Sequence, residues 1–247
     1  TSSARAITLI HGAAAQLAMT NSATARSGIA FTTQPVVRIL DAYGNLVSTG
    51  GQSTQTVTLT STGSTLSGTS AISASAGIAT FSNIALEGLI GSKTISAEIL
   101  TPSSFSTSGA VSLSFGDAAQ LTLERAAAGA ANRSAFTTQP QVALRDSAGN
   151  LVTGTAATIV YTASPNAALT LASAAVSTSN GIATFAFSSI RGTIGSYTIS
   201  YSVSGASASS IASVSQTLTL THGVAASYAF VQQPTTARAG ISLSEAV

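Results

Sequence analysis

The chain lacks cysteine and tryptophan altogether and carries very little charge. Without cysteine, neither a disulfide framework nor a thiolate metal site can form. Aromatic residues make up only 5% of the 247 residues, too few for the rows of exposed rings that carbohydrate-binding modules use. Charged residues make up 6%, against about 25% in ordinary globular proteins. The surface must therefore be covered mainly by hydroxyl groups and small side chains.

The low charge limits the partners that the chain can have. The formal net charge is +2, and no cluster of Lys and Arg is present, so we expect no nucleic-acid partner. No apolar run reaches the 18 residues that a transmembrane helix needs, so we expect no membrane span. Two interpretations remain open: an unusually neutral secreted domain, or a protein whose surfaces are covered by copies of itself.

Internal repetition is the strongest signal in the sequence. Five short motifs return in the same order after 104 or 105 residues. They are HGAAAQL at 11–17 and FGDAAQL at 115–121, FTTQP at 31–35 and 136–140, DAYGNLV at 41–47 and DSAGNLV at 146–152, GIATF at 77–81 and 181–185, and IGS at 90–92 and 194–196. The first motif appears a third time, more loosely, as HGVAASY at 222–228.

A period of about 105 residues is too long for a solenoid repeat and matches one immunoglobulin-like sandwich of about 100 residues. We therefore predict complete repeats at 12–115 and 116–222. The segment 1–11 aligns with the last strand of a repeat, because ITL at 7–9 matches VSL at 111–113 and LTL at 218–220. The segment 223–247 aligns with the first strand or strands of a following repeat.

Alternation of apolar residues with Thr and Ser predicts β-strands. Tyr197, Ile199, Tyr201 and Val203 are separated by single Thr or Ser residues, and the segments 56–60, 111–115 and 217–221 alternate in the same way. Successive side chains on a strand point to opposite faces, so this pattern buries one face of each strand. The sequence therefore predicts an all-β chain of tandem immunoglobulin-like antiparallel sandwiches. The Ala-rich segment 126–131 is expected to be a loop or an edge strand.

The two Asp-x-x-Gly-Asn segments are typical of turns. An Asp at the first position can accept hydrogen bonds from nearby backbone N–H groups, and Gly permits a positive φ. Asp41 and Asp146 are the only acidic position shared by both full repeats, so a calcium ligand is the competing interpretation. Calcium prefers six to eight oxygen ligands, and such a site would need Asp117 or Glu124 to contribute. We favour the turn.

The sequence offers little material for catalysis. His11 and His222 are aligned with Phe115, so we interpret their position as the boundary of a strand and not as a catalytic or metal site. Paired carboxylates, a G-x-S-x-G motif and a phosphate-binding loop are all missing. Lys93 has no counterpart in the second repeat, where Tyr197 stands, which argues against Lys–Asn isopeptide crosslinks. The sequon at Asn132 is interpreted as accidental. We predict no catalytic, cofactor-binding or metal-binding residue and no cofactor.

The motifs TQP, D-x-x-GNLV, GIATF and IGS-x-TIS resemble the bacterial immunoglobulin-like (Big-type) repeats of large surface proteins, which include giant adhesins and invasin/intimin-type arrays. The resemblance extends over the whole chain and implies an extracellular or cell-surface location, with a role as stalk, spacer, fibre or adhesive module. The very low charge departs from the acidic, calcium-stiffened stalks of that group and favours lateral packing.

We therefore predict a non-enzymatic extracellular fibre or filament built from tandem repeats, with neighbouring copies or repeats as partners. One variant is strand complementation, in which residues 6–10 complete a neighbouring sandwich near residues 223–247. The alternative is an adhesin stalk that presents a distal binding domain. A carbohydrate-binding module is a third hypothesis, and an enzyme a distant fourth.

Overall fold

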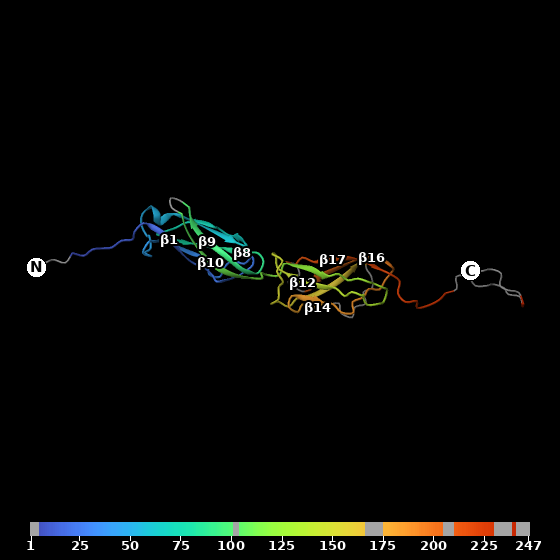
Figure 1. Ribbon diagram of the computed structural model, residues 1–247. Helices are drawn as coiled ribbons and strands as arrows, with labels where there is room; N and C mark the ends of the chain where they lie inside the picture. The colour runs from blue at the N-terminus through green and yellow to red at the C-terminus, as the bar shows by residue number, and fades with distance from the viewer. Residues whose placement is uncertain (1–4, 101–103, 166–174, 205–209, 230–238, 241–247) are drawn as a thin grey trace.

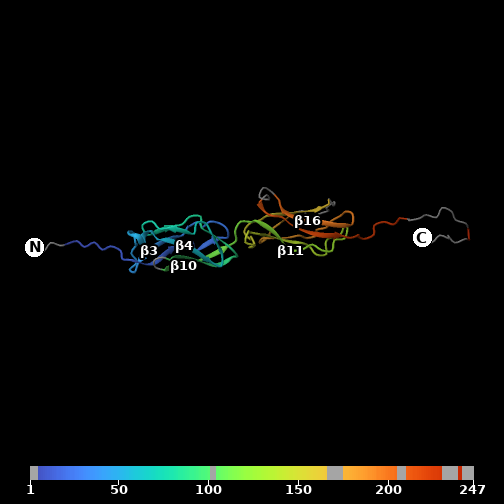
Figure 2. The same cartoon turned by 90° about the horizontal axis from the view of Figure 1, so that it is seen from above.

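The computed structural model describes residues 5–100, 104–165, 175–204, 210–229 and 239–240 of the chain. Strands dominate these residues, and the one helical segment described is a short 3-10 turn at Gly51–Thr54. None of the described segments forms a helix with the length and hydrophobicity needed to cross a bilayer. Two β-sandwiches lie end to end along one axis, and both views of the molecule agree on this arrangement (Figures 1 and 2).

The first sandwich consists of two facing sheets and a separate two-stranded sheet. The smaller sheet has the order β1-β3-β7, and the larger one has the order β2-β10-β9-β4-β6, while β5 pairs with β8. The strands are β1 (Ala14–Thr20), β2 (Thr24–Arg26), β3 (Val36–Asp41), β4 (Thr56–Thr62), β5 (Thr65–Ser67), β6 (Ala71–Ser73), β7 (Ile78–Thr80), β8 (Ala85–Glu87), β9 (Gly91–Ile99) and β10 (Phe105–Ser114).

The second sandwich repeats the two facing sheets. Their orders are β11-β12-β15 and β14-β13-β16-β17, which correspond to β1-β3-β7 and β6-β4-β9-β10, while β2, β5 and β8 have no counterpart strands among the described residues. The strands are β11 (Gln120–Arg125), β12 (Gln141–Arg145), β13 (Thr158–Ser164), β14 (Ala175–Ser177), β15 (Ile182–Thr184), β16 (Gly195–Val203) and β17 (Val214–Leu220). The fold is therefore all-β, with tandem immunoglobulin-like sandwiches, as the sequence predicted.

Each sandwich has its own hydrophobic core, and the apolar residues that alternate with Thr and Ser in the sequence fill it. On β16, Tyr197, Ile199, Tyr201 and Val203 are all buried, while the Thr and Ser residues between them are not. On β10, Val111 and Leu113 are buried in the same way. The first core draws on residues between 14 and 113, and the second on residues between 121 and 220. The boundaries at 11/12, 115/116 and 222/223 remain predictions.

One local feature differs from the predicted antiparallel arrangement. One strand pair is parallel, because the chain passes from β1 in one sheet to β2 in the other, where Thr24–Arg26 runs alongside β10 in the same direction. Residues 5–10 have no strand partner among the described residues, and their assignment to a preceding repeat or to a donor strand stays a prediction. Ile7 and Leu9 are 92% and 91% exposed, since this segment has no neighbouring strand to share a hydrogen-bond ladder with. Residues 126–131 form a loop with isolated bridges at Ala128 and Ala131.

Candidate functional site: the junction between the sandwiches

The turn after β3 is organised by one carboxylate. Asp41 Oδ1 accepts hydrogen bonds from the backbone N–H groups of Tyr43 and Asn45, both at 2.9 Å. Gly44 has a φ of 86°, which L-residues with side chains rarely adopt. These contacts confirm the predicted turn. The other carboxylate oxygen, Oδ2, accepts the N–H of Gly12 at 2.8 Å, so the same side chain also holds the segment that enters the sandwich.

The second sandwich repeats this arrangement after β12. Asp146 Oδ1 accepts the N–H of Asn150 at 2.8 Å, and Oδ2 accepts the N–H of Gly116 at 2.7 Å. Gly116 lies between the last strand of the first sandwich and the first strand of the second, and it packs against the Ser27 carbonyl too closely to carry a side chain. The turn of the second sandwich therefore anchors the linker that joins the two.

These contacts explain the ionisation of both carboxylates. The N–H of Gly12 and the side chain of Asn45 hold the pKa of Asp41 well below its ordinary value. Burial opposes ionisation of Asp146, but hydrogen bonds from Gly116 and Asn150 outweigh it, so the pKa of Asp146 is also lowered. Both residues are therefore charged acceptors at neutral pH, and hydrogen bonds to charged acceptors are the stronger kind.

Asn150 extends the second turn across the junction. Its Nδ2 donates to the carbonyl of Gly88 in the first sandwich at 2.9 Å, and its Oδ1 accepts the N–H of Ile90 at 2.9 Å. The same Nδ2 donates to Asp146 Oδ2 at 2.9 Å, and Asn150 is only 5% exposed. One buried side-chain amide thus connects the anchoring carboxylate to the 88–90 loop of the preceding sandwich. We call this arrangement the latch.

Two polar contacts at the rim surround the latch. Ser147 Oγ donates to Glu87 Oε1 at 2.7 Å, and Arg26 forms an ion pair with Asp117 at 2.7 Å. Both contacts are exposed to solvent, and exposed ion pairs contribute at most about 1 kcal/mol. The buried amide and carboxylate therefore define the junction, and the rim supplements them.

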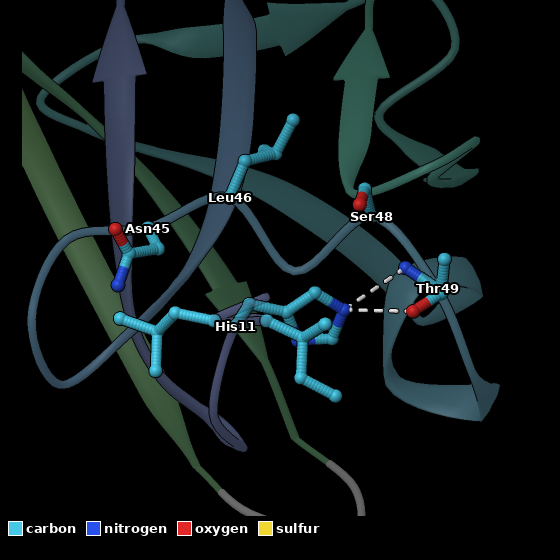
Figure 3. A pocket seen from close by; sticks show the side chains of 7 residues that line it. His11, Asn45, Leu46, Ser48 and Thr49 are labelled. Carbon is cyan, nitrogen blue, oxygen red and sulfur yellow. Dashed lines mark hydrogen bonds between the residues drawn. The ribbon is translucent and has the colours of Figure 1, made fainter. Parts of the chain in front are cut away.

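The exchange between His11 in the first repeat and Phe115 in the second is accompanied by an exchange between Thr49 and Gly154 beside it. His11 Nε2 lies 2.8 Å from Thr49 Oγ1, and the N–H of Thr49 donates to the same nitrogen (Figure 3). At the corresponding place in the second sandwich, the Phe115 ring lies over Gly154, where a Cβ would come within 3.3 Å of the ring. The polar ring is thus matched with Thr and the apolar ring with Gly. His222 is exposed.

A shallow pocket opens beside His11, at the end of the first sandwich that faces away from the junction. Its volume is 360 Å³, and Asn45, Leu46, Ser48 and Thr49 form one side while the entering segment forms the other (Figure 3). The lining residues from the entering segment are Leu9, Ile10 and His11. Asn45 therefore borders an open depression, whereas its counterpart Asn150 is covered by the first sandwich.

The residues of the competing calcium hypothesis are not brought together. Asp117 pairs with Arg26, and Glu124 Oε1 accepts from Arg145 at 2.7 Å, while the oxygens of Asp146 are taken by N–H donors. In the part of the chain that the structure describes, no group of three or more His, Cys, Asp or Glu could hold a metal ion.

Two other residues considered in the sequence are placed on the sandwiches. Lys93 lies half-buried on β9, opposite Val111. Asn132, the sequon residue, donates from Nδ2 to the Gly192 carbonyl at 2.7 Å, so its amide nitrogen takes part in a contact within the second sandwich.

Comparisons with known proteins add similarities of fold. No known protein-family model and no curated protein sequence matches the chain. Among solved structures, the chain is similar to the D0–D1 domains of intimin, with 16% identity, 82% of this chain and 97% of that chain covered, and a TM-score of 0.29. It is also similar to invasin, a bacterial integrin-binding protein, with 16% identity, coverage of 85% and 40%, and a TM-score of 0.32.

A β-glucuronidase from Parabacteroides merdae matches at 12% identity with a TM-score of 0.29. The match covers 83% of this chain but only 24% of the glucuronidase, so the chain spans about a quarter of that enzyme. Identities and TM-scores at this level carry no functional argument. No enzymatic role follows from them.

Proposed function

We propose that the chain is a non-enzymatic spacer segment of a bacterial surface protein of the adhesin type, in which tandem sandwiches hold a binding domain away from the cell. The observation that carries this proposal is the latch. A spacer transmits position only if consecutive domains keep a fixed orientation, and a buried amide that bridges two domains supplies such a constraint.

The physical argument starts from the flexibility of ordinary linkers. Domains joined by a short linker with a small polar interface usually move relative to one another. Here the linker N–H of Gly116 is bound to a buried carboxylate, and Asn150 makes two hydrogen bonds to the 88–90 loop. Bending the junction would expose or break these bonds, and a buried polar group left without a partner costs about 1–3 kcal/mol.

The test measures the relative orientation of the two sandwiches. Residual dipolar couplings and small-angle X-ray scattering of the wild-type chain at low concentration should fit one elongated arrangement. Asn150→Ala should broaden the distribution of orientations, because the two bonds from the buried amide to Gly88 and Ile90 are lost while only the exposed rim contacts remain. Asn45→Ala removes the equivalent amide away from the junction and is the matched control. A wild-type chain whose two sandwiches orient independently would contradict the proposal.

A fibre is the second candidate, and one observation favours it. Ile7 and Leu9 are exposed and alternate with Thr8, as Val111 and Leu113 alternate with Ser112 on the last strand of the first sandwich. An extended apolar segment of this kind suits donation to a neighbouring sheet edge. The proposed acceptor, 223–247, includes the exposed Val224 and Tyr228, while 230–238 and 241–247 lie outside the described residues.

Electron microscopy separates the fibre from the spacer. If strand donation operates, the purified chain should form filaments, and Ile7→Asp/Leu9→Asp should abolish them because a charged strand cannot enter an apolar face. Dispersed rods in both samples at high concentration would exclude the fibre and leave the spacer.

A further inference from the structure

The core of the second sandwich contains three hydroxyl groups that have no hydrogen-bond partner among the described residues. They belong to Tyr161, Ser188 and Tyr201, which are 3%, 0% and 0% exposed. Buried polar groups in folded proteins nearly always bind a protein atom or an ordered water molecule, because a group left without a partner costs free energy. These three oxygens therefore need a partner that the neighbouring side chains do not supply.

The three hydroxyls lie in one region of the core. Tyr161 and Tyr201 stand directly opposite each other on β13 and β16, and their ring centroids are 5.9 Å apart. Both rings pack against Phe185, and Ser188 follows Phe185 on the loop after β15, in the facing sheet. Burial raises the pKa of Tyr161, and the nearby side chain of Ser188 opposes that rise. The hydroxyls are thus neighbours, but none is a hydrogen-bond partner of another.

The backbone of Ser188 is fixed on the side away from the tyrosines. Its N–H donates to Gln139 Oε1 at 2.9 Å. Its carbonyl accepts from the N–H of Phe136 at 2.9 Å and from Gln139 Nε2 at 3.2 Å. The loop therefore cannot shift towards the tyrosine hydroxyls without losing these three bonds.

The first core has no polar side chain at the three equivalent positions, which are Leu59, Ile84 and Ala97. The backbone bonds are nevertheless the same, because the N–H of Ile84 donates to Gln34 and its carbonyl accepts from the N–H of Phe31. The hydroxyls of the second core thus occur as a set, at positions that face one another. Since serine is also smaller than isoleucine, the exchange removes carbon atoms at the place where it introduces polar ones.

We infer that the hydroxyls of Tyr161, Ser188 and Tyr201 bind one internal water molecule in the core of the second sandwich. Buried waters typically make about three hydrogen bonds to polar groups that otherwise lack a partner, and three such hydroxyls converge here. Each hydroxyl can donate or accept, so one water can pair with all of them. A metal ion does not suit the site, because three neutral hydroxyls cannot balance its charge in an apolar core.

Magnetic relaxation dispersion of the water oxygen tests the site in the full-length chain, because it detects water molecules that stay bound for longer than the protein takes to tumble. Tyr161→Phe/Ser188→Ala/Tyr201→Phe removes the three hydroxyls and keeps both rings. The dispersion amplitude should fall by the contribution of one long-lived water. Tyr197→Phe is the matched control on the same strand, since its hydroxyl already donates to the Thr193 carbonyl at 2.6 Å, and it should leave the amplitude unchanged.

A second measurement needs no variant and covers the case in which the triple variant does not fold. In the wild-type chain, a rotating-frame Overhauser spectrum should show a cross-peak between the bound water and the hydroxyl proton of Tyr161 or Tyr201. An unchanged dispersion amplitude in the folded triple variant, or cross-peaks that join the hydroxyls to one another and none to water, would overturn the inference. Neither result bears on the spacer, which is tested by the relative orientation of the two sandwiches.

Discussion

The two sandwiches share their polar turn but differ in the centre of their cores. The first core has Ile84, Leu59 and Ala97 where the second has Ser188, Tyr161 and Tyr201. The backbone around the first of these positions is the same in both, because Ile84 and Ser188 each make paired contacts with a Gln and a Phe of the same motif. Ile84 of the first core is thus replaced by a smaller residue, while Leu59 and Ala97 are each replaced by a larger tyrosine, so the shape of the core differs between the two sandwiches.

The second core gains an aromatic cluster from this exchange. The ring centroids of Tyr161, Phe185 and Tyr201 lie 5.5–5.9 Å apart, and Tyr161 meets Phe185 edge to face. Burial raises the pKa of Tyr201, and its hydroxyl has no hydrogen-bond partner among the described residues. The two repeats therefore differ in the residues at the centre of their cores, whereas both keep the Asp-x-x-Gly-Asn turn that binds the entering segment.

We expect the largest change in the free energy of unfolding when Tyr201 in the second core is replaced by alanine, the residue at the equivalent position of the first core. Tyr201→Ala should lower the free energy of unfolding by about 4 kcal/mol, although alanine occupies the equivalent position 97, because the cavity has no neighbour large enough to fill it. Adding Tyr161→Leu and Ser188→Ile restores the shape of the first core and should recover part of the loss. Urea denaturation of the three variants measures this. A loss below about 1 kcal/mol for Tyr201→Ala would show that the cores are not alternative packings.

The next effect separates the two turns. Asp146→Ala leaves the N–H groups of Gly116 and Asn150 without their charged acceptor and should cost about 3 kcal/mol. Hydrogen exchange should show loss of protection in the second sandwich and at the 88–90 loop. Asp41→Ala, the matched variant, should affect the first sandwich without changing exchange at that loop. Equal effects of both variants on the loop would mean that Asp146 has no special role at the junction.

Acid should weaken both turns by the same mechanism. Both Asp41 and Asp146 have pKa values lowered in the folded state. Their contribution is therefore complete above the unfolded value of about 3.9 and is lost as the pH falls below it towards the folded values. The free energy of unfolding should be constant near neutral pH and fall below about pH 4. Asp41→Asn/Asp146→Asn should be less stable at neutral pH and show a flatter profile, and an unchanged slope would contradict this assignment.

The sequence predicted the sandwiches and the turns but not the latch. The alternating apolar residues of β16 and the repeated D-x-x-GN motif reflect the geometry of a single strand and a single turn. Such short-range patterns are visible in the sequence. The bond between Asn150 and Gly88 joins residues 62 apart and depends on which loop ends beside the linker. A signal was present nonetheless, because Asn45 and Asn150, and the IGS motifs after Gly88 and Gly192, recur together. The assignment of residues 1–11 to the last strand of a preceding repeat or to a donor strand stays a prediction, because alternation supplies an apolar face but does not say which sheet it joins.

The smallest effect tests whether the His/Phe position is structural. His11 and Thr49 form a hydrogen-bonded pair, while Phe115 and Gly154 form an apolar one. His11→Phe should cost about 1 kcal/mol, because the larger apolar ring meets the Thr49 side chain and leaves its hydroxyl without the imidazole. His11→Phe/Thr49→Gly should recover roughly half of that by reproducing the second pair, less the entropy cost of a new glycine. Thermal denaturation of the single and double variants gives the coupling between the two sites. Additive losses would mean that the ring at position 11 does not depend on its neighbour, and the paired exchange between the two sandwiches would then have no packing basis.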